Sequence, residues 1–239
     1  ASQDGGRMAG YGAIVSSGTL LAVIGHSGSA VLASGLYYLL GSTLAMAAFM
    51  LLIELTERIR PPGAALIAIT MEAFAIEDKP EEPVGVGIPG SLAFLGLSFA
   101  ACALVISGMP PLAGFVAKFS LFHAMLASTA EMSGGVPTRT WVLIALMVTG
   151  GLAAIIALMR LGVRTFWAAG VVTPPRLQVS EAAPVTALVL LCVLLTVQAG
   201  TVFDYLGRTV DGLARNANYA ARVLGEPPVL RAPAAEGAR

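Results

Sequence analysis

Five long apolar stretches, each almost free of charged residues, constrain the fold of this chain more than any other feature of its sequence. They cover residues 8–25, 30–53, 89–130, 141–159 and 184–203. A helix needs about 20 apolar residues to cross the hydrocarbon core of a bilayer, and each stretch is long enough to do so. The sequence therefore predicts an all-α protein, a polytopic transmembrane helix bundle with about five spans.

The composition argues against several other classes of protein. Hydrophobic residues make up 56% of the 239 positions and charged residues only 12%, which is far from the values of a soluble domain. The formal net charge of zero argues against nucleic acid as a partner. Cys102 and Cys192 fall inside apolar stretches, so we predict neither a disulfide framework nor a metal site, and no motif indicates a cofactor. The chain begins without an initiator methionine or a signal peptide, so we expect it to be part of a longer polypeptide.

The third stretch contains a helix break followed by a basic residue. Gly108, Pro110, Pro111 and Gly114 interrupt it, and the prolines exclude a continuous helix because they lack amide donors and clash with the preceding turn. Lys118 is the only charged residue between positions 83 and 130. A charge at membrane depth costs at least about 2.5 kcal/mol unless it meets a partner or water. Interrupted helices are typical of ion sites in transporters, so the pattern predicts an ion-translocation site.

Two questions about this stretch stay open at the level of sequence. The alternative to a broken crossing is a hairpin between two ordinary spans, with Lys118 reaching toward the lipid headgroups. No carboxylate lies deep in any span, so we expect the partner of Lys118 to be water or a group outside this chain.

The basic residues favour a single broken crossing over two crossings. If residues 89–130 cross once, one side of the membrane collects Arg7, Arg58, Arg60, Lys79, Arg160, Arg164 and Arg176. That asymmetry follows the positive-inside rule, whereas two crossings would divide these residues between the two faces.

The remaining segments are predicted to lie at the membrane surface. Residues 61–83 are predicted to form a loop that contains an interfacial apolar segment, 64–76, and an acidic turn. Residues 205–224 place Arg208, Arg215 and Arg222 every seven residues opposite an apolar stripe, the pattern of an amphipathic helix. Residues 225–239 are predicted to be a mobile tail. The division is therefore 1–204 for the transmembrane part and 205–239 for the amphipathic helix and tail.

Histidines and tyrosines supply further candidates for moving protons. His123 follows Lys118 by five residues, about 140° around a helix, so the two side chains do not share a face. A histidine can titrate near neutral pH, so His123 is a candidate for the proton path, with packing as the alternative. His26 lies in a predicted turn, where we expect it to be solvated. Tyr37 and Tyr38 can donate to buried water or serve helix packing.

Three segments together resemble one family of membrane subunits. Residues 107–119, Ser-Gly-Met-Pro-Pro-Leu-Ala-Gly-Phe-Val-Ala-Lys-Phe, resemble the broken-helix motif of the antiporter-like subunits. Mrp-type cation/proton antiporters, respiratory complex I and membrane-bound hydrogenases share these subunits. Residues 7–18 and 159–167 also resemble segments of this family. With residues 76–78 and 86–101, they are most similar to the D-type subunits of proteobacterial Mrp antiporters.

The resemblance implies a function and a set of site residues. Residues 1–204 would be the C-terminal transmembrane part of a proton-translocating subunit of a multisubunit Na⁺ (monovalent cation)/H⁺ antiporter, a transporter and not an enzyme. Lys118 matches the lysine with which the family exchanges protons, and Pro110, Pro111 and Gly114 match the break. The implied partners are the other antiporter subunits, the lipid bilayer, H⁺ and Na⁺, and the implied location is the bacterial inner membrane. The alternatives are a proton-pumping subunit of complex I or a membrane-bound hydrogenase, and a non-transporting scaffold subunit.

Overall fold

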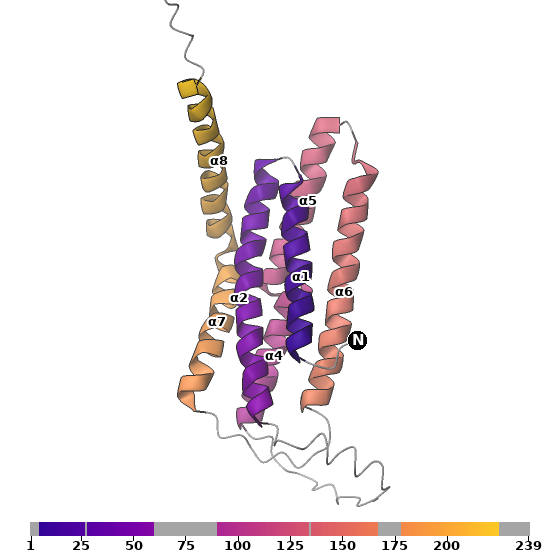
Figure 1. Ribbon diagram of the computed structural model, residues 1–239, viewed down its shortest axis with the longest axis vertical. Helices are drawn as coiled ribbons and strands as arrows, with labels where there is room; N and C mark the ends of the chain where they lie inside the picture. The colour runs from indigo at the N-terminus through magenta and orange to yellow at the C-terminus, as the bar shows by residue number, and fades with distance from the viewer. Residues whose placement is uncertain (1–4, 27, 60–89, 134, 167–177, 225–239) are drawn as a thin grey trace, which may run out of the picture.

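The computed structural model describes residues 5–26, 28–59, 90–133, 135–166 and 178–224, in which all regular structure is helical (Figure 1). The helices of these ranges are α1 (Gly5–Ile24), α2 (Ser29–Ile59), α4 (Gly90–Ser107), α5 (Ala113–Ser133), α6 (Thr138–Phe166), α7 (Val179–Val197) and α8 (Ala199–Leu224). Five of them, α1, α2, α4, α6 and α7, are long and apolar enough to cross a membrane. The predicted polytopic helical bundle is confirmed.

Helix α2 is the central element of the bundle. It contacts α1, α4, α5, α7 and α8, while α6 packs against α1 and α4. Its side chains Tyr37, Phe49 and Leu52 are fully buried, because neighbouring helices surround it along most of its length. The core therefore follows α2, which positions five of these helices directly, while α6 is held mainly through α4 and α1.

The predicted break is present between α4 and α5. Helix α4 ends in a Schellman motif, in which the Met109 amide donates to the Leu104 carbonyl at 3.0 Å and the Gly108 amide to the Val105 carbonyl at 3.2 Å. Gly108 has φ +78°, a left-handed conformation that glycine adopts without steric cost. The two prolines follow, and helix α5 begins at Ala113. The sequence Gly-Met-Pro-Pro thus ends α4, and α5 begins only after it.

The two halves of the broken element run in the same direction. Figure 1 shows α4 rising from one end of the bundle to its middle and α5 continuing toward the other end. Gly114 of α5 lies directly against the Val105 carbonyl of α4, so closely that a Cβ atom there would overlap it. The first turn of α5 therefore lies beside the last turn of α4. This overlap brings Lys118 next to the end of α4.

Several helices begin or end at one end of the bundle, the lower end in Figure 1. The C-terminal ends of α2 and α6 and the N-terminal ends of α4 and α7 all lie there. Arg139, at the start of α6, lies at the opposite end. The predicted loop at 61–83, with its interfacial segment, and the tail at 225–239 lie outside the described residues.

The last apolar stretch is divided differently from our expectation of a span at 184–203 and a surface helix at 205–224. Helix α7 ends at Val197, where the Gln198 amide donates to the Leu194 carbonyl at 2.9 Å, and α8 begins at Ala199. Helix α8 continues past the end of the bundle in Figure 1, but its first turns pack on α2. Leu206 and Val210 belong to the apolar stripe of α8, which extends back toward α7, and both are buried in the contact with α2.

Candidate functional site

Lys118 binds the carbonyl end of helix α4. Its Nζ atom donates to the Ser107 carbonyl oxygen at 2.7 Å and lies 3.5 Å from the Ile106 carbonyl oxygen. The last carbonyls of a helix lack intrahelical partners, and together they carry a partial negative charge that favours a cation. The sequence led us to expect water or a group outside the chain as partner. That expectation omitted backbone carbonyls, which the overlap of α4 and α5 brings within reach.

Two glycines leave room for the Lys118 side chain. A Cβ atom on Gly108 would lie 2.9 Å from Nζ of Lys118 and 2.5 Å from its Cδ. A Cβ atom on Gly151 of α6 would lie 2.9 Å from the Ser107 carbonyl oxygen and 3.2 Å from Nζ. Gly151 was not among the site residues expected from the sequence. The structure shows that the close approach is to the lysine and its acceptor.

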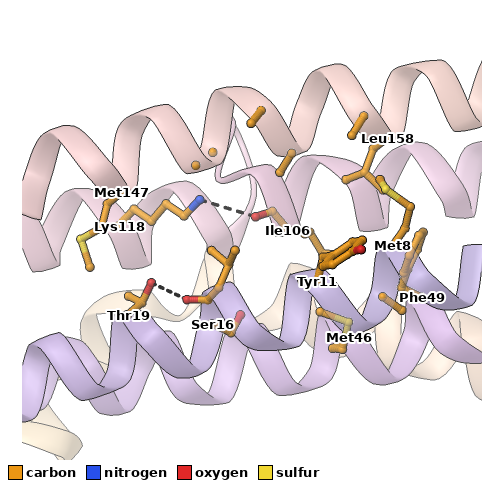
Figure 2. Close-up of a pocket in the computed structure, with 18 of the residues that line it drawn as sticks. Met8, Tyr11, Ser16, Thr19, Met46, Phe49, Ile106, Lys118, Met147 and Leu158 are labelled. Atoms are coloured by element: carbon orange, nitrogen blue, oxygen red, sulfur yellow. Dashed lines mark hydrogen bonds between the residues drawn. The ribbon is translucent and has the colours of Figure 1, made fainter. Parts of the chain in front are cut away.

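A cavity of about 310 Å³ opens beside Lys118 (Figure 2). It lies between α1, α2, α6 and the break, and most of its lining is apolar or small. The α6 wall consists largely of Gly150, Gly151, Ala153, Ala154 and Ala157, whose small side chains leave the space open. The polar side chains of the lining are Lys118, Tyr11, Ser16, Thr19 and Tyr38. The cavity thus combines one ionisable amine with hydroxyl groups from α1 and α2, and it is large enough to hold water.

The two histidines lie away from this cavity. His123 is exposed on α5 and does not line it. His26 is half-buried in the turn between α1 and α2, where its Nε2 atom lies 3.4 Å from the Thr140 hydroxyl oxygen of α6. His26 is therefore only partly solvated, because the α1–α2 turn packs beside the start of α6. The described residues place neither histidine within hydrogen-bond distance of Lys118.

Comparison with known proteins supports the resemblance read from the motifs. No protein-family model matches the chain. A protein of Rhizobium meliloti (strain 1021), named as the D component of a probable K⁺/H⁺ antiporter, is 46% identical over 230 residues, or 95% of this chain. The chain spans 43% of the length of that relative. Over nearly its whole length the chain, a multi-pass membrane protein, is therefore similar to a D-type antiporter subunit.

Proposed function

We propose that this chain is the proton-translocating part of a multisubunit monovalent cation/proton antiporter, with Lys118 as the group that gains and loses the proton. The observation that carries the proposal is the pairing of the Lys118 ammonium with the Ser107 carbonyl beside a cavity of about 310 Å³. The carbonyl end of α4 stabilises the charged amine at membrane depth. The cavity gives the same amine access to water.

The chemistry of lysine fits this role. An ammonium donates to the Ser107 carbonyl, whereas a neutral amine loses most of that attraction and is free to accept a proton from water in the cavity. A lysine in a protein interior loses its proton far more readily than an arginine does. The flexible stem of Lys118 lets the amine move between the carbonyl and the cavity. One side chain can therefore adopt both the protonated and the neutral state that a transport cycle needs.

The transported cation and the setting are part of this proposal. The relative is named for K⁺/H⁺ antiport, whereas the resemblance of the sequence pointed to Na⁺. We propose that the complete complex exchanges a monovalent cation for H⁺ in the bacterial inner membrane, together with other antiporter subunits. Residues 1–204 would form the C-terminal transmembrane part of this subunit. Flux driven separately by Na⁺ and K⁺ gradients distinguishes the two cations.

Lys118 substitutions in the complete complex test the proposal. Lys118→Met removes the proton-binding group, and Lys118→Arg introduces a guanidinium that does not release its proton. We expect both variants to assemble and both to lose most cation-driven proton flux into vesicles, normalised to complex content. Arg139→Met, which removes an exposed charge outside the cavity, is the control and should transport normally.

Wild-type flux in the Lys118→Met complex would refute the exchange role and favour the scaffold alternative. Membership of complex I or a hydrogenase would show instead as redox-driven proton flux. The name of the relative favours an antiporter.

A further inference from the structure

The neighbouring tyrosines of α2 have different hydroxyl partners. Both rings are buried, with 0% of Tyr37 and 6% of Tyr38 exposed. The Tyr37 hydroxyl donates to the Leu195 carbonyl oxygen of α7 at 2.9 Å, and its ring stacks on Phe203 with the centroids 4.3 Å apart. The Tyr38 hydroxyl lies 3.3 Å from the Ser16 hydroxyl, and both residues line the cavity of Lys118. Tyr37 therefore joins helices, whereas Tyr38 belongs to the cavity.

The Ser16 hydroxyl also differs from its neighbours on α1. Ser17 and Thr19 each donate at 2.9 Å to a carbonyl of their own helix, as serine and threonine commonly do in helices. Ser16 instead pairs with Tyr38 across two helices, and either oxygen can be the donor. One hydrogen bond uses only one of the two hydroxyl protons. The pair thus keeps a second proton and unused lone pairs for water in the cavity.

A second cavity, of about 20 Å³, also borders the Ser16–Tyr38 pair. It is lined by Gly41 and Ser42 of α2 and by residues around the break, and it shares Ser16, Tyr38, Met46 and Ile106 with the larger cavity. Its volume is sufficient for one water molecule. The Ser16 and Tyr38 hydroxyls can supply polar partners for such a water, and the Ser42 hydroxyl, which donates to the Leu39 carbonyl at 3.2 Å, can accept from it. The pair therefore borders both the cavity beside Lys118 and a second space large enough for one water molecule.

We propose that the Ser16–Tyr38 hydroxyl pair relays protons between the cavity of Lys118 and a water molecule in the smaller cavity. The inference rests on the proposed proton exchange at Lys118. The Lys118 ammonium gives its proton to a water in the larger cavity, and one hydroxyl oxygen of the pair then accepts a proton from that water. The pair releases one of its own hydroxyl protons to the water in the smaller cavity. Each hydroxyl ends with one proton, one positive charge has moved, and rotation of the hydroxyls restores the starting orientation.

Tyr38→Phe in the complete complex tests the relay, because it removes the hydroxyl and keeps the ring. We expect assembly to be normal and cation-driven proton flux in vesicles to fall by about a hundredfold or more, the lower end of the range for loss of a proton-transfer group. The flux that remains should be slowed more by D₂O than wild-type flux, since proton transfer becomes limiting. Ser16→Ala should reduce flux similarly, and the double variant should be little worse than either single variant, because both interrupt one path.

Tyr37→Phe is the matched control. It loses a hydroxyl of the same kind at the adjacent position, and the Leu195 carbonyl loses its donor, so the melting temperature of the complex should fall. Flux per folded complex and its D₂O effect should equal those of the wild type.

Two results would overturn the relay. Wild-type flux in Tyr38→Phe, with Lys118→Met inactive, would exclude the relay and leave the role of Lys118 standing. Equal losses of flux and melting temperature in the two tyrosine variants, without a changed D₂O effect, would show that Tyr38 has a structural role only. Normal flux in Lys118→Met would instead refute the proposed function, whatever the tyrosine variants do.

Discussion

Lys118 shows how a positive charge packed between helices can be held by backbone carbonyls, with no carboxylate among its contacts in the described residues. Its charge costs at least about 2.5 kcal/mol at membrane depth. A hydrogen bond to a charged group contributes about 1.5–3 kcal/mol, and a cation at a partly buried helix C-terminus gains up to about 2 kcal/mol. The 2.7 Å bond to Ser107 and the end of α4 therefore offset the cost. A charge whose cost is largely offset in this way would suit the proton exchange that we propose for Lys118.

A role of His123 in the proton path stays a prediction. Glutamine has a similar polar side chain but no titrating group, so the role predicts that His123→Gln shifts the pH dependence of proton flux. His26→Gln is the control, because His26 contacts Thr140 at the end of the bundle and does not line the cavity. Its pH profile should match that of the wild type. A profile in His123→Gln that coincides with both would remove His123 from the proton path.

At the scale of single elements, the break was predictable and the α7–α8 boundary was not. The adjacent prolines and Gly108 have local steric effects, so the sequence alone indicates where α4 stops. The apolar stretch at 184–203 carries no such signal at Gln198, and α7 begins at Val179 and runs through Pro184. The partner of Lys118 and the different hydroxyl partners of Tyr37 and Tyr38 could not be predicted from the sequence either. They depend on which helices become neighbours, and helical periodicity does not contain that information.

The overlap between α4 and α5 should be sensitive to one methyl group. Gly114→Ala places a Cβ atom where the Val105 carbonyl oxygen lies, so the halves must separate or shift. We expect a loss of about 1–3 kcal/mol in stability, the usual cost of overpacking, together with reduced flux because Lys118 moves away from Ser107. The melting temperature and proton flux of the complex measure both effects. Gly96→Ala on α4, with nothing within 4 Å of the added methyl, should leave both at least at wild-type values. An unchanged melting temperature in Gly114→Ala would contradict the overlap.

For the whole molecule, the arrangement of helix ends specifies which positions share a side of the membrane. Helix α4 ends and α5 begins near the middle of the bundle, so the two helices together extend from one end of the bundle to the other (Figure 1). The start of α4 and the end of α6 lie at the same end, and the start of α6 lies at the other. The basic residues Arg7, Arg160 and Arg164 belong to helix ends that lie toward the lower end in Figure 1. By the positive-inside rule we expect that end to face the cytoplasm.

Cysteine labelling in the assembled complex tests this topology. Gly90, Arg139 and Arg164 are exposed, and the native Cys102 and Cys192 are buried, so an impermeant thiol reagent should react mainly with introduced cysteines. We expect Gly90→Cys and Arg164→Cys to react from the cytoplasmic side and Arg139→Cys from the opposite side. Labelling of Gly90→Cys and Arg139→Cys from the same side would mean that residues 89–130 cross twice. In that case Lys118 would belong to an ordinary span, and the pairing of its ammonium with the end of α4 at membrane depth would have to be abandoned.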